Sequence, residues 1–274
     1  MEIKEKLMQS TLQGRDGPNL YRKTAITVGV IYLLGTVFGV GGNIIVQSIL
    51  GAPDHLAALS TNSMLVAIGA LLWLLSGTVI DAAHGILMFP VVKQFSERIA
   101  VGYFGARIID AIFVGIMALF ILFQIPLGSE YVKAGIADTS YLQGLSAVLM
   151  QAQLYAYDLG MITVGFAGLI LNYVFYRARL LPRILGAWGV VGYAVILGGS
   201  VLEVMGFNLS LIHTIPGGLW ELFMGVWLIA KGLNSSPAPS KRISGIGSTG
   251  SKSQSPTSAC SCSKPAEAWS TLCL

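Results

Sequence analysis

Six ionisable side chains lie within long apolar stretches of the sequence and are the residues best suited to chemistry. They are Asp81, His84, Arg107, Asp110, Asp158 and Glu221. Asp81 and His84 are three residues apart, as are Arg107 and Asp110, so each pair shares one face of a helix. Carboxylates near an arginine and a histidine can form ion pairs, line a polar cavity or pass protons.

The motifs of soluble enzymes are absent from the sequence. It has no P-loop, no glycine-rich dinucleotide motif between a strand and a helix, no His-Glu-x-x-His and no Gly-x-Ser-x-Gly. Only three histidines occur, and no two of them are spaced as metal ligands. We therefore predict no catalytic residue, no bound metal and no cofactor.

The elements that carry the ionisable residues are strongly apolar. Hydrophobic types make up 54% of the 274 residues and charged types 11%, whereas roughly 25% of the residues in a soluble domain are charged. This composition excludes a soluble domain, a disordered chain, a disulfide-rich secreted scaffold and a nucleic-acid-binding protein. What remains is a protein that crosses a lipid bilayer several times.

Six stretches are apolar enough to cross about 30 Å of hydrocarbon, which takes roughly 20 helical residues. They cover approximately residues 24–48, 63–92, 99–123, 145–175, 184–205 and 209–231. We predict an all-α fold, a polytopic transmembrane helical bundle with six spans. Pro126 should follow the end of the third span, and Pro216-Gly217-Gly218 should break or kink the sixth. A short helix is expected to start within Ala52-Pro53-Asp54-His55-Leu56.

Lysine and arginine predict the orientation of the bundle, because they favour the cytoplasmic side of a membrane. If six spans alternate, fifteen of the seventeen basic residues fall on one side, together with both ends of the chain. The other side has only Lys133, and Arg107 lies inside a span. We therefore predict a plasma (inner) membrane protein with both termini in the cytoplasm.

Three segments follow from this pattern. Residues 1–23 form a basic cytoplasmic N-terminus, residues 24–231 the six-span transmembrane domain, and residues 232–274 a tail rich in Ser, Gly and Pro that is predicted to be disordered. The tail holds the three cysteines, which are expected to be free thiols: Cys260, Cys262 and Cys273. The role and origin of this tail stay open.

A charge in the bilayer core costs about 2.5–3.5 kcal/mol on insertion scales, so the charged groups in the spans must face one another, water or an interface. Arg107 keeps its proton and needs an anionic partner, for which Asp110, Asp158 and Glu221 are the candidates. One hypothesis is a dry ion pair that only orients helices. The other is a water-filled cavity lined by all six residues.

Four residues in the spans have further expectations at this stage. Asp81 and His84 lie at the same depth as Arg107 and Asp110, but their long span would also let them reach the cytoplasmic interface. Glu203, close to the outer end of the fifth span, is expected to be solvated. His213 is expected to be an interfacial residue.

The sequence resembles a bacterial membrane family catalogued as domain of unknown function 4386, over roughly residues 20–233. The matching pieces are Ala52-Pro53-Asp54-His55-Leu56, Tyr103-x-x-x-Arg107-x-x-Asp110, Tyr176-Arg177-Ala178-Arg179-Leu180-Leu181-Pro182-Arg183, Pro216, Glu221 and Trp227-Leu228-Ile229-Ala230-Lys231-Gly232. Asp81 and His84 depart from the apolar pattern of the family, and the tail after Lys231 looks foreign to it. The resemblance implies a bacterial plasma-membrane protein and adds no activity.

Three classes of function remain open. A non-catalytic helper, sensor or assembly subunit is favoured by the small size of the chain and its lack of a soluble domain. A conduit or transporter for a small solute or protons would use the buried polar residues, and an intramembrane enzyme is the third alternative. Other membrane subunits or a second copy of the chain are open as partners. A continuous polar cavity would favour the second or third class.

Overall fold

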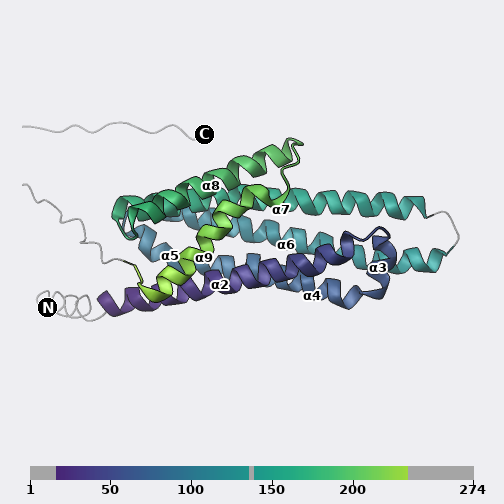
Figure 1. Cartoon of the computed structure of the whole chain (residues 1–274), viewed down its shortest axis with the longest axis horizontal. Helices are drawn as coiled ribbons and strands as arrows, with labels where there is room; N and C mark the ends of the chain where they lie inside the picture. The colour runs from purple at the N-terminus through teal and green to yellow at the C-terminus, as the bar shows by residue number, and fades with distance from the viewer. Residues whose placement is uncertain (1–16, 136–138, 234–274) are drawn as a thin grey trace, which may run out of the picture. The chain divides into compact units, whose positions relative to one another are not determined.

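The computed structural model describes residues 17–135 and 139–233, and within these residues the chain is helical, without strands (Figure 1). Its elements are α2 (Gly17–Leu50), α3 (His55–Thr61), α4 (Ser63–Trp73), η1 (Leu74–Ile80), α5 (Asp81–Lys93), α6 (Glu97–Ala134), α7 (Ser140–Ala178), α8 (Arg183–Val204), η2 (Ser210–Thr214) and α9 (Ile215–Ala230). The predicted tail and most of the predicted N-terminal segment lie outside the described residues.

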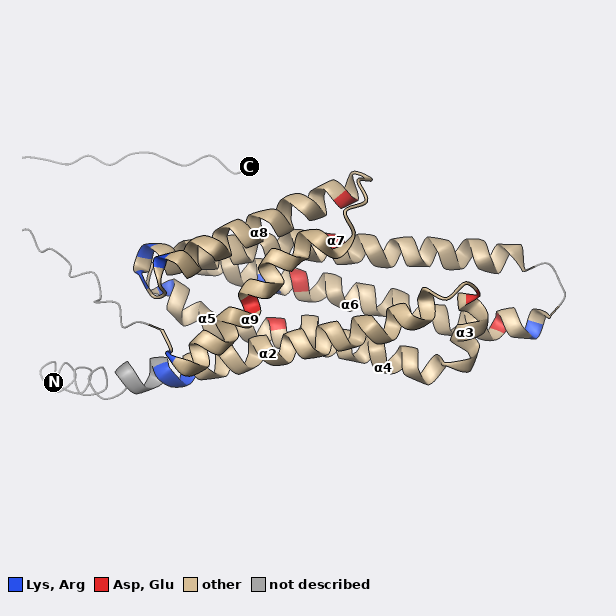
Figure 2. Ribbon diagram, viewed as in Figure 1, with Lys and Arg blue, Asp and Glu red and all other residues tan. Residues whose placement is uncertain are grey.

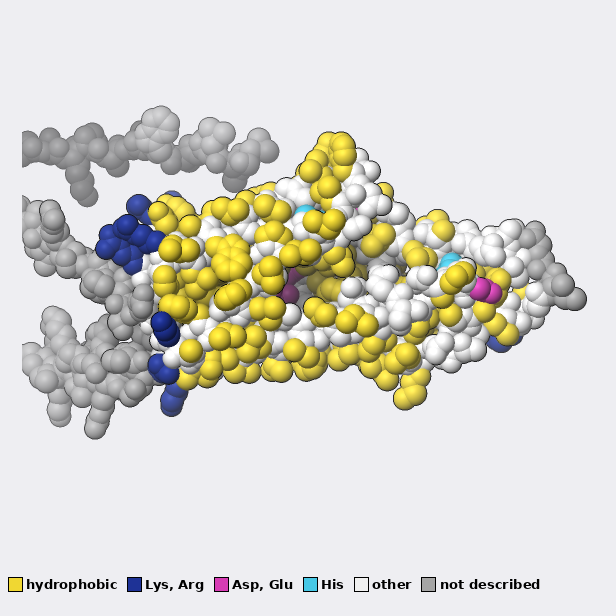
Figure 3. Space-filling model, in the orientation of Figure 1, with side chains coloured by type: hydrophobic (Ala, Val, Ile, Leu, Met, Phe, Trp, Pro, Cys, Tyr) yellow, Lys and Arg dark blue, Asp and Glu magenta, His cyan; other side chains and the backbone are white. Residues whose placement is uncertain are grey.

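Six of these helical segments are long and apolar enough to cross a membrane, which confirms the predicted number of spans. They are Arg22–Leu50, Ser63–Lys93, Glu97–Ala134, Ser140–Ala178, Arg183–Val204 and Ser210–Ala230. Large apolar side chains such as Val37, Ile44 and Ile184 are exposed on the outside of the bundle, and Figure 3 shows apolar side chains over much of one face, interleaved with other atoms. This surface contacts the lipid bilayer.

The predicted boundary at Pro126 is wrong. The third span continues to Ala134, with Pro126 inside α6, and α7 already begins at Ser140. Tertiary contacts hold the extra turns, because Gly128 packs so closely on α3 that a Cβ there would lie 2.6 Å from the Leu59 Cβ. A proline in the sequence therefore did not end the helix, and the predicted loop at residues 124–144 is only a short connection.

Two other local predictions are confirmed. A short helix, α3, follows Asp54, whose Oδ1 accepts a hydrogen bond from the Ala57 amide at 3.2 Å. The sixth span is broken as expected: a tight 3₁₀ turn, η2, precedes α9, and Pro216 lies in the first turn of that helix. Proline is favoured there because the first turn has no intrahelical use for its missing amide hydrogen.

The helices form a closed bundle in which α6 packs on α7, α7 on α8, α8 on α9, and α9 on α2. The crossing of α2 and α9 is very close, because a Cβ on Gly29 would lie 2.7 Å from the carbonyl oxygen of Gly225. Small residues are the usual means of bringing membrane helices together. Buried apolar side chains form two clusters, one near each end of the bundle.

Basic residues gather at one end of this bundle, which we call the basic end (Figure 2). The described members are Arg22, Lys23, Lys93, Arg98, Arg177, Arg179, Arg183 and Lys231. The opposite end, called the far end, carries α3, the end of α6 and the start of α7, whereas the turn before α9 lies short of it. Its described basic residue is Lys133, which pairs with Glu130 at 2.7 Å.

Candidate functional site

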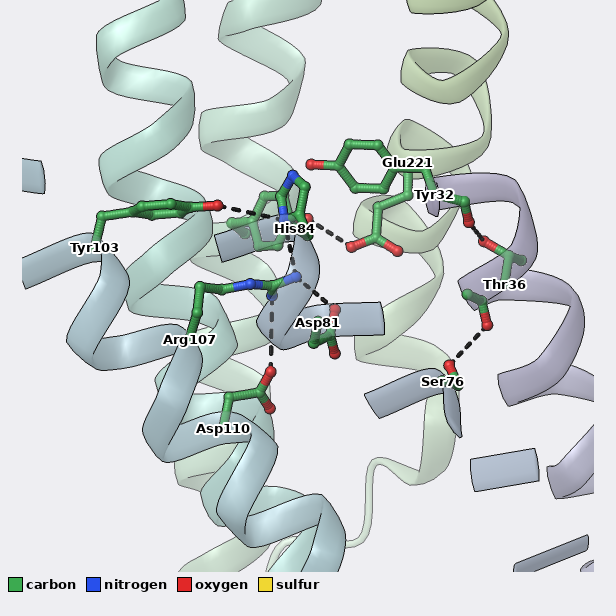
Figure 4. Close-up of polar contacts among 11 residues, drawn as sticks. Tyr32, Thr36, Ser76, Asp81, His84, Tyr103, Arg107, Asp110 and Glu221 are labelled. Carbon is green, nitrogen blue, oxygen red and sulfur yellow. Dashed lines mark hydrogen bonds and ion pairs between the residues drawn. The ribbon is translucent and has the colours of Figure 1, made fainter. Parts of the chain in front are cut away.

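Arg107 is the centre of a buried group of polar residues from several helices (Figure 4). Its side chain extends from α6, and the whole residue is only 4% exposed. One terminal nitrogen, Nη2, lies 2.5 Å from Asp81 Oδ1 and 3.0 Å from His84 Nδ1. The other, Nη1, lies 3.7 Å from Asp110 Oδ2. Together with Glu221, these residues are called the polar cluster below.

The closest anionic partner of Arg107 is therefore Asp81, which differs from the prediction. Asp110, three residues away on the same helix, makes only the longer contact, and the contacts found for Arg107 do not include Asp158 or Glu221. Asp81 and His84 also do not extend to an interface, because both turn toward Arg107. Their position follows from the distorted turn that precedes them.

That turn, η1, is a π-helical segment in the middle of the second span, and Asp81 begins the helix directly after it. Two hydroxyl groups of η1 fix it to both neighbours. Ser76 Oγ donates to the Gly35 carbonyl oxygen of α2 at 2.8 Å, and Thr78 Oγ1 donates to the Ala111 carbonyl oxygen of α6 at 3.0 Å. Wide helical turns of this kind are rare and occur often at functional sites.

His84 adopts a defined tautomer because of its contact with arginine. A guanidinium can only donate, so Nδ1 must accept from Arg107 Nη2, and the ring hydrogen is then on Nε2. The Tyr103 hydroxyl lies 3.3 Å from the same Nδ1. His84 is thus a neutral imidazole in this arrangement, and its Nε2 has no hydrogen-bond partner among the described residues.

Two carboxyl groups complete the polar cluster. Asp110 is fully buried, and neither of its oxygens accepts a hydrogen bond within the described residues. Glu221, on α9, accepts a hydrogen bond from the Tyr193 hydroxyl at 2.6 Å. Three carboxyl groups therefore accompany one guanidinium, and the cluster is neutral overall only if it also holds two further positive charges, as protons or as bound cations.

Two tyrosine side chains close the cluster toward α2 and α8. The sequence analysis did not single them out. The Tyr32 ring lies 4.7 Å from the His84 ring, and its hydroxyl has no partner among the described residues. Tyr193 reaches Glu221 from α8. A tyrosine in the middle of an apolar span, far from the interfaces that tyrosine favours, was the available signal for Tyr32.

The polar cluster borders a cavity of about 220 Å³, called the cluster cavity. Its polar lining consists of Tyr32, Thr36, Ser76, Asp81, His84, Arg107, Tyr157, Thr214 and Glu221. Figure 3 shows a hollow in the middle of the apolar surface with an acidic side chain visible inside it. Four of the five members of the polar cluster line this space, and Asp110 does not.

A second cavity of about 380 Å³, called the vestibule, adjoins the cluster cavity toward the far end. The two cavities share the side chains of Trp73 and Tyr157, whose rings are 5.9 Å apart. The polar residues of the vestibule are Asn43, Gln47, Gln151, Gln153, Tyr157, Asp158, Glu203, Ser210 and His213. Asp158 belongs to this vestibule and not to the polar cluster, with which the sequence analysis had grouped it.

Glu203 and His213, the remaining ionisable residues of the fifth and sixth spans, also line the vestibule. Glu203 is partly buried, and its Oε1 accepts a hydrogen bond from the Leu209 amide at 2.6 Å. His213 is buried beside Gly199, and its Nε2 lies 3.2 Å from Ser200 Oγ. Its expected interfacial position is therefore replaced by a buried one at the cavity wall.

Toward the basic end the polar cluster is covered by packed apolar side chains, called the apolar plug. Its members include Met88, Val92, Val174, Phe175, Trp220 and Leu228, each at most 1% exposed. Met88, Val92, Val174, Phe175 and Leu228 lie on the basic-end side of the cluster, as the direction of each helix requires. Trp220 directly precedes Glu221 on α9, and its Nε1 donates to the Leu185 carbonyl oxygen at 2.8 Å. The cavities therefore extend from mid-bundle toward the far end, whereas the plug is closely packed.

These features define a polytopic helical membrane protein with a polar cavity inside its bundle. The chain belongs to the family described as Domain of unknown function (DUF4386), whose model matches residues 27–232. This match covers all six spans apart from a few terminal residues and confirms the resemblance found in the sequence. The chain has no match among curated proteins or solved structures.

Proposed function

We propose that the protein is a transporter that carries a small solute or protons through its six-helix bundle by way of the polar cluster. The observation that supports this most strongly is the pair of neighbouring polar cavities, the cluster cavity and the vestibule, which share Trp73 and Tyr157 and lie on one side of the apolar plug. A site at mid-membrane that is accessible from one side and closed on the other is what alternating access requires.

The rival functions fit these cavities less well. The helper, sensor or assembly role drew its support from the small size of the chain, and such a role needs no charged cavity. An intramembrane enzyme of the serine type needs a free hydroxyl next to a base. The serine that lines the cluster cavity, Ser76, instead donates its hydroxyl to the Gly35 carbonyl oxygen. We therefore place transport before both alternatives.

The proposal includes an orientation and a location. Because basic residues favour the cytoplasmic side, the basic end faces the cytoplasm and the vestibule opens outward. Both termini are then cytoplasmic, in the plasma membrane of a bacterium, as the family resemblance implies. The six-span domain of residues 24–231 is the transporting unit, and the buried polar residues with Asp158 form its functional site.

Fusions of a reporter protein test this orientation. A reporter inserted near Gly135, at the far end, is expected to be active outside the cytoplasm, whereas one fused after Ser236 is expected to be active inside. The reason is that the fifteen basic residues on one side resist translocation. Alkaline phosphatase and a fluorescent protein measure the two locations. The opposite pattern would contradict the orientation.

Chemical access to the cluster cavity tests the transport path. In a background with all three native cysteines replaced by serine, Thr36→Cys places a thiol in the cavity wall. We expect a membrane-impermeant cationic methanethiosulfonate added from the far-end side to modify it, because that side is open to water. The extent of labelling is measured by mass spectrometry on intact vesicles.

The matched control is Val174→Cys, a change of similar size within the apolar plug. Its thiol should react only after unfolding. If Thr36→Cys stays unmodified in the folded protein, or if both thiols react equally, the one-sided path is wrong and the helper role regains its preference.

A further inference from the structure

The vestibule has an excess of negative charge that the described residues do not balance. Asp158 and Glu203 line it, and among the described residues neither lysine nor arginine does. Glu203 accepts one backbone hydrogen bond, but Asp158, although only 7% exposed, has no hydrogen-bond or ion-pair partner there. A low-dielectric cleft with charges of one sign concentrates ions of the opposite sign.

A second observation points independently to a missing ligand. Gln153 is also 7% exposed, lines the same cavity, and its Oε1 has no hydrogen-bond partner among the described residues. Burying an amide oxygen without a donor costs about 1–3 kcal/mol, so a donor group in the vestibule would relieve this cost. His213 Nδ1, in the same wall, is unpartnered too.

The wall between the two cavities is aromatic. The rings of Trp73 and Tyr157 meet edge to face at 5.9 Å, and both line the cluster cavity and the vestibule. Aromatic faces attract organic cations, tryptophan most strongly. The vestibule thus combines carboxylates, an amide acceptor and aromatic surface around one space.

We infer that the vestibule binds a small organic cation that carries an ammonium group, with Asp158 as its counter-ion and Gln153 as a hydrogen-bond acceptor. Its volume of about 380 Å³ falls within the roughly 300–1,000 Å³ typical of small-molecule sites. A metal ion fits less well, since no three His, Cys, Asp or Glu side chains of the described residues converge on one point. The inference rests on the proposed function, because it assigns a substrate class to the same path.

The carboxyl groups of the polar cluster supply the next step along this path. Once past Trp73 and Tyr157, an ammonium group meets Asp81 and Glu221, which line the cluster cavity. These carboxyl groups exceed the single guanidinium in number. An incoming cation can therefore displace protons from these carboxyl groups. The cluster then balances the charge of the cation without an additional anion.

Binding to the purified full-length protein in detergent tests the inference. The probe is 2-phenylethylammonium, compared with the neutral 2-phenylethanol and the anionic 3-phenylpropanoate at equal ionic strength, by isothermal titration calorimetry. We expect saturable binding of the ammonium compound alone. Asp158→Asn should weaken it at least tenfold, and Glu130→Gln, which removes a surface carboxylate at the far end, should leave it unchanged.

Asp158→Asn keeps the size of the side chain and breaks no hydrogen bond of the described residues, so the variant is expected to fold. The comparison of the three compounds uses the unaltered protein and does not depend on any variant. Four results would each overturn the inference. They are equal binding of all three compounds, preference for the anion, the same binding heat from sodium chloride as from the ammonium compound, and full affinity in Asp158→Asn. Lost binding with intact labelling of Thr36→Cys overturns only the substrate class. Retained binding without labelling overturns only the transport path.

Discussion

Asp81→Leu is expected to lower the free energy of unfolding by about 3–5 kcal/mol, the usual cost of removing one member of a buried ion pair. The substitution leaves the Arg107 residue, 4% exposed, with the 3.7 Å contact to Asp110 as its remaining ion pair among the described residues. Arginine cannot release its proton to reduce that cost. Unfolding in detergent, followed by circular dichroism or by proteolysis, measures the loss.

Arg107→Leu should be less harmful than Asp81→Leu, and the reason is chemical. The carboxyl groups left behind can take up protons, whereas the guanidinium left by the reverse change cannot become neutral. The destabilisation by Arg107→Leu is therefore expected to shrink as the pH is lowered. The loss caused by Asp81→Leu should not shrink in this way.

The double variant of Asp81 and Arg107 should recover most of the loss, because neither charge is then left alone. Pairing Arg107→Leu with Asp110→Leu should recover less, since Asp110 makes the longer contact. The exposed pair Lys133–Glu130 serves as a control, and its removal should cost less than about 1 kcal/mol. Strictly additive losses for Asp81 and Arg107 would mean that cavity water, and not Asp81, solvates the guanidinium.

The number of spans could be predicted because it depends on averages over many residues. Apolar length and the distribution of lysine and arginine are redundant signals, so an error at one position does little harm. The end of the third span depended on the single residue Pro126, and contacts of Gly128 with α3 outweighed it. Helix ends that are set by tertiary contacts leave little trace in local sequence.

Part of the candidate site could be predicted for a similar reason. Ionisable residues in apolar spans must find partners, so grouping Asp81, His84, Arg107 and Glu221 needed only the cost of burying charge. Which carboxylate lies closest to Arg107 depends on the rotation of the second span, and the wide turn η1 changes that rotation just before Asp81. Sequence spacing assumes regular helices, and the candidates it offered were Asp110, Asp158 and Glu221, without Asp81.

The position of Asp158 relative to Arg107 could not be predicted from the sequence either. Its sequence position near the middle of the fourth span made it one of the candidate partners of Arg107. The fourth span is 39 residues long, so its midpoint does not coincide with the midpoint of the others. Asp158 consequently lies in the vestibule, and this position gives it a different chemical role from the polar cluster.

Gly168→Ala is expected to destabilise the protein by about 1–3 kcal/mol, the usual cost of overpacking a core. A Cβ at this position of α7 would lie 2.0 Å from Cδ1 of the Tyr193 ring on α8. The ring cannot move aside freely, because it is almost fully buried and its hydroxyl donates to Glu221. The substitution should thus loosen the α7–α8 contact and disturb one carboxyl group of the polar cluster together.

Gly198→Ala, on α8, is the matched control, since a Cβ there meets no atom within 4 Å. It should be neutral or slightly stabilising, because alanine is favoured over glycine in a helix by roughly 0.5–1 kcal/mol. In the Gly168→Ala background, Tyr193→Leu should cost less than it does alone, since it also removes the clash. Equal unfolding midpoints for Gly168→Ala and Gly198→Ala would contradict the close packing of α7 on α8. That packing positions Tyr193 beside Glu221, so the position of Glu221 at the cavity would be in doubt as well.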